Sequence, residues 1–335
     1  MAFAIARCAM ATITLPHPGH PLVLVESTER GKLQEMDRGD LIALYKSHGA
    51  ILFRGFDADL SQFHAFAQQF CSSSVVNESP GRTPLDRDAT IYSVDGGTNA
   101  FPLHPELSRE PWKPDLAMFG CLAAPGAGGQ TTLCDGIALA RALPAKVREG
   151  LSGRRLIYIA ATWPGLLAYW LGTATPSDEE LLHPPSSCPY EFNRLPDGQI
   201  IRHFSRPALH RPMFAEGPAF GNFLLFARFN NGRTDFPLLD DLSCVPDDWM
   251  QAIKAAADGL TLAVSWQAGD VLMLDNTRFM HGRTAILDPA ARQIASYFGY
   301  LNFAEPDPEE IADPIWRRKP FQPPRPPPQL LQRGR

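Results

Sequence analysis

The sequence lacks the features that mark several common classes of protein. Its six cysteines are scattered, with no CxxC pair and no zinc-type spacing, which argues against a disulfide framework and favours a reducing cytoplasm. A net charge of -5, without any block of like charges, argues against nucleic acid as a partner. No apolar run approaches the roughly 20 residues of a membrane span, and we find no internal repeat. We therefore expect a cytoplasmic protein that binds a small molecule and neither nucleic acid nor membrane.

The bulk composition is that of a globular protein. Of its 335 residues, 44% are hydrophobic and 20% are charged, enough for one large domain or two smaller ones. The alanine-rich start is interpreted as a plain N-terminus that enters a first strand, because Arg7 interrupts the short apolar stretch of a targeting segment. Proline is concentrated after Glu305, so residues 305–335 are interpreted as a proline-rich tail, and its end, "PFQPPRPPPQLLQRGR" (320–335), is predicted to be extended or disordered.

Two kinds of pattern follow one another along the chain. Apolar residues at helical spacing predict helices over 38–48 and 60–70, the first ended by Gly49. From about residue 100, short apolar runs with Gly and Pro punctuation predict many short strands, as in a sandwich or barrel. These predicted strands lie within 115–123, 129–135, 223–231, 260–266, 270–276 and 294–304, and a late helix over 247–259 is expected to be capped by Asp247 or Asp248.

A long polar segment interrupts the strands. Residues 171–190 are rich in proline and serine, and long loops in compact domains are often lids. We therefore expect one mainly β domain with flanking helices over residues 1–304, with a lid between about 163 and 215 and the proline-rich tail at 305–335.

A histidine and a glutamate stand one residue apart in "FPLHPELSRE" (101–110). His104 and Glu106 both offer good ligands for a divalent metal, although two such residues are common by chance. His281 is a third candidate, expected in a polar turn after an apolar strand, and a jelly roll would bring it to the early pair. Two histidines and one carboxylate form the facial triad of non-haem Fe(II) oxygenases, which leaves the remaining positions free for cosubstrate and oxygen.

Two further residues suit a bound carboxylate. Arg292 lies just before the final apolar strand, and its guanidinium can grip a carboxylate through two parallel hydrogen bonds. Thr131, in "GAGGQTTLCD", offers a hydroxyl to the same group.

Together these segments resemble the Fe(II)/2-oxoglutarate-dependent dioxygenases of the taurine dioxygenase (TauD/TfdA) class, with closer relatives in clavaminate synthase and antibiotic-pathway amino-acid hydroxylases. The resemblance covers roughly residues 35–305 and includes "GAILFRGF", the HxE motif, the Gly-Gly-x-Thr strand and the Gly-Asp…Asp-Asn…His-Gly-Arg segment. It implies a double-stranded β-helix (jelly roll, cupin-like) in which His104, Glu106 and His281 bind Fe(II). By the same resemblance, Arg292 and Thr131 hold the distal carboxylate of 2-oxoglutarate. The implied reaction uses O2 to hydroxylate an aliphatic C–H bond and releases succinate and CO2.

Two positions depart from these relatives. Clavaminate synthase spaces its arginine further from the second histidine, at a place that here holds Ala295. Taurine dioxygenase has a second arginine for its sulfonate substrate where this chain has Ser296, which disfavours a taurine-like sulfonate. The resemblance favours an amino acid or a natural-product intermediate as the substrate, free or tethered to a carrier protein.

Five residues are candidates for contact with the substrate. They are Phe101 beside the HxE motif, His203, Arg228 and Asn230, the last two in the apolar run at 223–231, which resembles the strand opposite the triad in this family, and Arg283 just after His281. Of these, His203 precedes that run by 20 residues. Each has a structural alternative: strand packing or surface exposure in general, and for Arg283 an ion pair with an acid such as Asp275.

Other reactions remain open at this point. Desaturation, cyclisation and epimerisation begin with the same hydrogen abstraction as hydroxylation. Jelly rolls with His and carboxylate ligands also serve as non-redox metal enzymes and binding modules, but these need no arginine placed like Arg292. Halogenation is disfavoured, because halogenases leave the carboxylate position empty for chloride and Glu106 fills it here.

Overall fold

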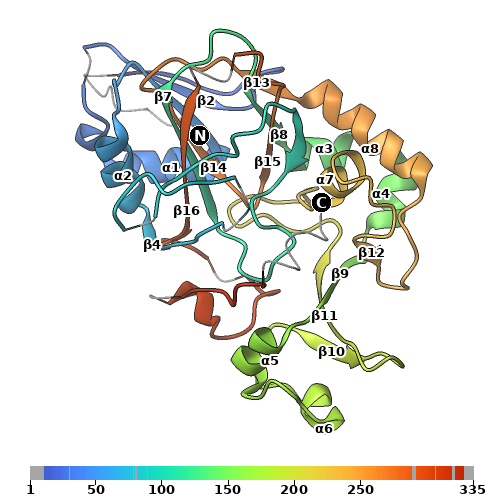
Figure 1. The fold of residues 1–335 in the computed structure, drawn as a ribbon. Coiled ribbons are helices and arrows are strands. Elements are labelled where there is room, and N and C mark those ends of the chain that lie inside the picture. The colour runs from blue at the N-terminus through green and yellow to red at the C-terminus, as the bar shows by residue number, and fades with distance from the viewer. Residues whose placement is uncertain are drawn as a thin grey trace.

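Strands from opposite ends of the chain alternate in the largest sheet of the protein (Figure 1). At its centre, β3 (Ala50–Arg54), β14 (Val271–Asp275), β7 (Leu116–Ala123) and β16 (Gln293–Leu301) pair in that order, all antiparallel. β1 (Ala11–Thr14) and β2 (Val23–Ser27) extend the β3 edge, while β4 (Cys71–Ser74) and β5 (Tyr92–Ser93) pair with β16. The computed structural model describes residues 11–29, 31–77, 79, 81–88, 90–288, 292–305, 307–318 and 321–327.

A smaller sheet faces these central strands. It consists of β13 (Leu262–Val264), β8 (Thr131–Asp135), β15 (Phe279–Arg283) and β6 (Phe101–His104), in that order. The Phe119 ring on β7 lies 5.0 Å from the His281 ring on β15, and Leu133, Val264 and Phe298 belong to the same buried cluster. Two sheets, antiparallel except for the parallel β2–β3 pair, pack face to face and form the jelly roll that the resemblance implied.

Helices cover the outer face of each sheet. α1 (Arg38–His48) and α2 (Leu60–Gln68), preceded by the short 3-10 helix η1 (Leu33–Glu35), pack on the large sheet. α3 (Gly136–Ala142), α4 (Ala145–Leu151), α7 (Leu224–Phe229) and α8 (Asp247–Leu260) pack on the small one. Gly49 ends α1 with a φ of 75°, as predicted. None of the helices in the described part of the chain has the length and apolar character needed to cross a bilayer.

The insertion contributes two strands to a third sheet, which lies toward the bottom of the view in Figure 1. β10 (Glu191–Arg194), β11 (Ile200–Pro207), β9 (Arg155–Ala161) and β12 (Leu238–Leu239) form it, with α5 (Pro164–Leu171) and α6 (Asp178–Leu182) alongside. The segment predicted as a loop thus contains a helix, because Ser177 and Glu180 form a capping box at the start of α6.

Three local predictions were wrong. Residues 224–229 form α7 and not a strand, since a short continuous apolar run fits a buried helix as well as a buried strand. His281 lies within β15 and not in a turn. Pro246 precedes α8 as its N-cap. Asp247 and Asp248 occupy the first turn, where acidic side chains interact favourably with the positive end of the helix dipole.

The proline-rich tail is partly folded. Its short 3-10 helix η2 (Ile315–Arg317) buries Trp316 to 2% exposure. This helix precedes the segment 320–335 that is predicted to be extended or disordered, of which the described residues 321–327 form neither helix nor strand. Arg317 donates two hydrogen bonds, of 2.8 and 2.9 Å, to the buried carboxylate of Asp115. Arg155 pairs with Glu309 at 2.8 Å, and the Phe321 ring lies 5.8 Å from the Trp112 ring. Apolar burial and ion pairs therefore hold this segment on the body. Residues 328–335 lie outside the described residues.

Candidate metal centre and pocket

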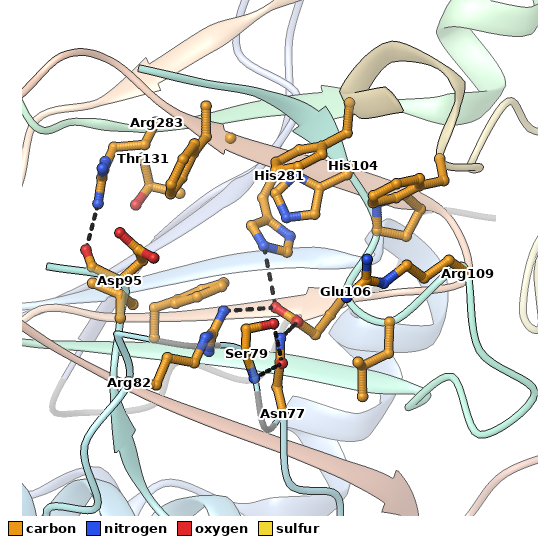
Figure 2. Close-up of a pocket in the computed structure, with 18 of the residues that line it drawn as sticks. Asn77, Ser79, Arg82, Asp95, His104, Glu106, Arg109, Thr131, His281 and Arg283 are labelled. Carbon is orange, nitrogen blue, oxygen red and sulfur yellow. Dashed lines mark hydrogen bonds and ion pairs between the residues drawn. The ribbon is translucent and has the colours of Figure 1, made fainter. Parts of the chain in front are cut away.

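Strand pairing brings the three predicted ligands together. His281 on β15 is the direct cross-strand partner of His104 on β6, and their ring centroids lie 4.7 Å apart. Glu106 follows β6 by two residues, and its Oε2 lies 3.6 Å from Nε2 of His281. One ligand atom from each of the three residues lies within 4.8 Å of the others (Figure 2).

The electrostatics of the cluster suit metal binding. Burial, followed by the charge of His281, lowers the pKa of His104 to about 3, so its imidazole is neutral at physiological pH. Its Nδ1 donates to the carbonyl of Pro102 at 2.9 Å, which leaves the Nε2 lone pair for a ligand bond. Burial alone raises the pKa of Glu106, but Arg82, His281 and His104 together hold it well below its usual range. Glu106 is therefore a carboxylate.

Three residues that sequence reasoning missed hold Glu106 in place. Asn276 accepts a 2.7 Å hydrogen bond from the Glu106 backbone N–H and donates to the Glu106 carbonyl at 3.1 Å. Asn77 donates to Oε1 of the carboxylate, and Nη2 of Arg82 lies 3.4 Å from Oε2 (Figure 2). Asn276 follows the strand "VLMLD", but nothing in its local sequence identifies Glu106 as its partner. Asn77 and Arg82 lie in loops without any local signal.

The donor set fits a divalent transition metal. Two imidazoles and one carboxylate are the ligands that non-haem Fe(II) takes in open facial sites. Nδ1 of His281 is buried and has no hydrogen-bond partner among the described residues. The cluster therefore lines a pocket and contains a buried nitrogen atom without a hydrogen-bond partner.

Arg292 and Thr131 line the same pocket. Nε of Arg292 donates to the carbonyl of Gly129 at 3.0 Å, and among the described carboxylates none forms an ion pair with this guanidinium. Burial and the nearby charge of Arg283 lower the pKa of Arg292 to about 10. The Thr131 hydroxyl accepts a 3.2 Å hydrogen bond from the Trp266 indole, which leaves its own proton to donate. The arrangement can bind a carboxylate.

Two of the predicted substrate residues, Phe101 and Arg283, also line the pocket. Arg283 stacks over Phe101, with its guanidinium carbon 4.4 Å from the ring centroid, and donates to the carbonyls of Asp95 and Asn99 at 2.7 and 2.8 Å. The alternative ion pair with Asp275 is absent, because that carboxylate accepts hydrogen bonds from Thr277. Arg283 therefore fixes the pocket wall formed by residues 95–99.

The other three substrate candidates lie outside this pocket, so their selection is corrected. His203 on β11 contacts Asn193 at 2.9 Å, within the third sheet. Arg228 pairs with Asp247 and donates to the Val245 carbonyl. Asn230 is exposed after the end of α7. The helical conformation of residues 224–229 turns Arg228 away, while Phe223 and Phe226, which sequence reasoning missed, line the pocket.

The insertion does not reach the pocket in this conformation. Among the described residues that line it, none comes from 163–215. Phe204, Arg206 and His210 line a second cavity instead, together with Lys113 and Trp316. A lid function for the insertion stays a prediction.

Comparison with known proteins identifies solved structures with the same fold. PvcB from Pseudomonas aeruginosa, described as an Fe, alpha-ketoglutarate-dependent oxygenase from an isonitrile synthetic pathway, superposes with a TM-score of 0.57 at 16% identity, covering 92% of this chain and 98% of PvcB. A taurine dioxygenase from Burkholderia xenovorans gives 0.56 at 14% identity, with 90% and 96% covered. AAD-2, solved with Mn(II) and N-oxalylglycine, gives 0.53 at 15% identity, with 89% and 99% covered.

No curated protein matches the chain. The model of one protein family matches residues 21–296, a range that includes His104, Glu106 and His281. The chain therefore belongs to the taurine catabolism dioxygenase TauD, TfdA family and is an Fe(II)- and 2-oxoglutarate-dependent oxygenase.

Proposed function

We propose that His104, Glu106 and His281 bind Fe(II), and that the enzyme hydroxylates an aliphatic C–H bond of an amino acid or natural-product intermediate. The substrate is free or tethered to a carrier protein. The observation that carries the metal assignment is the convergence of three ligand atoms within 4.8 Å in a buried pocket. The resemblance to amino-acid hydroxylases supports the substrate class.

In this proposal, Arg292 and Thr131 bind the distal carboxylate of 2-oxoglutarate. Arg292 supports the role because it is a partly buried guanidinium with which no described carboxylate forms an ion pair. Fe(II) with bound 2-oxoglutarate and O2 supplies the oxidant for C–H cleavage, and 2-oxoglutarate leaves as succinate and CO2. The protein orients the reactants: Asn276 fixes the Glu106 backbone, and Phe119, Phe223 and Phe226 exclude water from the reacting face.

Two alternatives keep part of this assignment. Desaturation, cyclisation or epimerisation would use the same ligands and the same first hydrogen abstraction. A non-redox cupin-type enzyme or binding module would use the metal ligands but would need no second carboxylate site. The position of Arg292 in the pocket favours the 2-oxoglutarate enzyme.

An anaerobic titration tests the metal and cosubstrate sites. Adding 2-oxoglutarate to the Fe(II)-loaded protein should produce a visible metal-to-ligand charge-transfer band. Glu106→Ala should bind Fe(II) much more weakly, and both the band and coupled hydroxylation should be lost. Glu110→Ala removes a carboxylate four positions later and outside the cluster, and it should keep the band. An unchanged band in Glu106→Ala would rule out Glu106 as a ligand.

A turnover screen tests the substrate class. The anaerobically loaded enzyme is exposed to oxygen with amino acids and with carrier-bound aminoacyl groups, and succinate is measured. Stimulation by one of these groups is expected. Background turnover across this panel, together with stimulation by another compound class, would contradict the amino-acid assignment and leave the oxygenase assignment intact.

A further inference from the structure

A second cavity lies next to the metal pocket but is separate from it. Its volume is about 550 Å³, against about 160 Å³ for the metal pocket, and the two have no described lining residue in common. The loop after β6 divides them, since Pro105 and Arg109 line the metal pocket whereas Pro111 and Lys113 line the second cavity. A molecule in the second cavity would therefore not touch the metal-ligand cluster.

Three parts of the chain enclose this second cavity. They are the loop at 111–115, β11 with the residues that follow it to 213, and the segment from 305 to 317. The wall combines charged groups with apolar side chains, among them Phe204, Met213 and Ile311. Cavities of about 300–1,000 Å³ are the size of small-molecule sites, so the second cavity has room for one.

Most charged side chains of the wall already belong to ion pairs. These pairs are Asp115–Arg317, Glu310–Arg317, Glu309–Arg155, Glu305–Lys46 and Arg211–Glu216. Of the remaining acids, the Glu191 side chain is 82% exposed, and Asp307 accepts the Glu309 N–H within its own turn. Two cations of the wall, Lys113 and Arg206, form no ion pair with any described carboxylate.

Lys113 is partly buried without a partner. Its ammonium forms no hydrogen bond with any described residue, and Asp275, Asp307 and Asp115 attract it only from beyond ion-pair distance. Burial, followed by the charge of Arg206, lowers the pKa of Lys113 to about 7. A cation that is removed from water without a counter-charge is costly, so an anion in the cavity would be stabilised here.

Arg206 lies within electrostatic reach of Lys113 and has donors to spare. Its Nη2 donates to the carbonyls of Glu110 and Pro111, at 2.9 Å each, which holds the guanidinium in place. Nε is buried and has no hydrogen-bond partner in the described part of the chain. Because a guanidinium has five N–H donors, Arg206 can still bind an acceptor that enters the cavity.

The neighbouring histidine adds no third charge. Burial, followed by the charge of Lys113, lowers the pKa of His210 to about 3, and its Nε2 donates to the Thr277 carbonyl at 2.6 Å. The site therefore has two cationic groups and a neutral imidazole.

We propose that the second cavity binds a small organic anion, whose carboxylate or phosphate group lies between Lys113 and Arg206 and whose apolar part contacts Phe204 and Ile311. The oxyanion supplies the acceptors and the negative charge that both cations lack. This ligand is additional to the substrate and to 2-oxoglutarate, so the inference does not depend on the proposed function.

Calorimetry with matched probe pairs tests the site. The Fe(II)-loaded protein is saturated with 2-oxoglutarate, kept free of oxygen, and titrated with hexanoate and hexanamide and with hexyl phosphate and hexanol. Saturation keeps the probes out of the cosubstrate site. At least one charged probe should bind about tenfold or more tightly than its uncharged partner, as expected for a partly buried ionic contact. The larger ratio distinguishes a carboxylate ligand from a phosphate ligand.

Variants assign the charge preference to the two cations. Lys113→Gln and Arg206→Gln should each reduce it to about threefold or less and leave the Kd for 2-oxoglutarate unchanged. Arg211→Gln is the matched control, because Arg211 lines the same cavity but is 70% exposed and paired with Glu216. It should change the probe affinities by less than about twofold.

Stability gives a second readout that does not require Arg206→Gln to fold. Lys113→Met replaces an unpartnered cation by an apolar chain of similar length, so in the absence of probe the urea midpoint should rise. The tighter charged probe should then raise the midpoint of the wild-type protein but not that of Lys113→Met. A lysine with a purely structural role would give a lower midpoint when replaced.

Four outcomes would overturn the proposal. They are equal affinity within both probe pairs, a charge preference that survives in Lys113→Gln, an equal loss in Arg211→Gln and Arg206→Gln, and a lower urea midpoint in Lys113→Met. Failure of the proposed function is distinct, because the wild-type protein would then form no visible band with 2-oxoglutarate, whatever the probes do.

Discussion

At the scale of single residues, one asparagine fixes the position of a metal-ligand candidate. Asn276 is 1% exposed and bonds to the N–H and C=O of Glu106 and to the carbonyl of Pro114, at 2.7, 3.1 and 2.8 Å. It ties the end of β14 to the loop after β6. The direction of the Glu106 side chain therefore depends on a residue that touches only its backbone.

Removing this contact should affect stability and metal binding together. Asn276→Ala leaves buried backbone groups unpaired, at about 1–3 kcal/mol each, and should weaken Fe(II) binding. Asn222→Ala is a matched control: Asn222 is also a buried asparagine that bonds to backbone groups, of Ala208 and Leu224. It should lower the free energy of unfolding without changing the Kd for Fe(II). Equal metal affinity in the two variants would refute the positioning role.

Arg292 should determine the affinity for 2-oxoglutarate. Losing a charge-assisted contact that leaves a buried charge unpaired costs on the order of 2–5 kcal/mol, so Arg292→Ala should raise the Kd about 30-fold or more. Arg87→Ala, at an exposed position, is the control. An unchanged cosubstrate Kd in Arg292→Ala would show that another residue holds the carboxylate.

The candidate ligands were predictable because their chemistry resides in the residue types. His104 and Glu106 are metal donors one residue apart, and the strand before His281 and the Arg292 that follows it separate these three residues from the other histidines. Asn77 and Arg82 have no such signal, since amide and guanidinium groups are common in loops and their role here depends on three-dimensional contact with Glu106.

At the scale of elements, a glycine turn shapes the carboxylate site. Gly129 has a φ of 68° just before β8, and a Cβ there would lie 2.9 Å from Cδ of Arg292. The close approach lets the Gly129 carbonyl accept the Arg292 Nε–H. The turn before β8 thus orients the guanidinium of Arg292, which lies just before β16.

Gly129→Ala should therefore impair cosubstrate binding. The methyl group displaces Arg292, and we expect the Kd for 2-oxoglutarate to rise about fivefold or more, since overpacking costs about 1–3 kcal/mol. Gly153→Ala is the matched control, because Gly153 has a φ of 71° but open space around its added Cβ. Both variants share the backbone strain. A similar Kd in both would refute the steric argument.

Element prediction succeeded where pattern and length agreed. The apolar runs at 115–123, 270–276 and 294–304 form β7, β14 and β16, the central strands of the large sheet. It failed at 223–231, where the run has no period that separates a helix from a strand and where packing against β6 and α8 decides the outcome.

At the scale of the whole molecule, the segment after β16 belongs to the folded body. Asp115 is 2% exposed, and among the described residues its carboxylate forms an ion pair with Arg317 alone and accepts one further hydrogen bond, from the Leu301 N–H. Composition alone predicts a proline-rich tail and does not show that the part before residue 320 packs on the body. The segment packs on the body because Trp316 is buried and Arg317 pairs with Asp115.

Arg317→Ala should destabilise the whole protein. Breaking a buried ion pair by removing one partner costs about 3–5 kcal/mol, so the free energy of unfolding in urea should fall by that order. Arg318→Ala removes the neighbouring arginine, which pairs with Asp313 on the surface, and should change it by less than about 1 kcal/mol. Equal effects would mean that the segment does not stabilise the body.

The alternation of early and late strands also governs the order in which the chain can fold. β14 separates β3 from β7, and His281 faces His104 across a pairing that closes most of the chain into a loop. Such long-range pairings carry a large entropic cost and make folding slow. A growing chain that ends before β15 has neither a complete central sheet nor a complete ligand set. Under the proposed function, the complete set of iron ligands exists only after β15 has been made, so iron can stabilise the fold only late in synthesis.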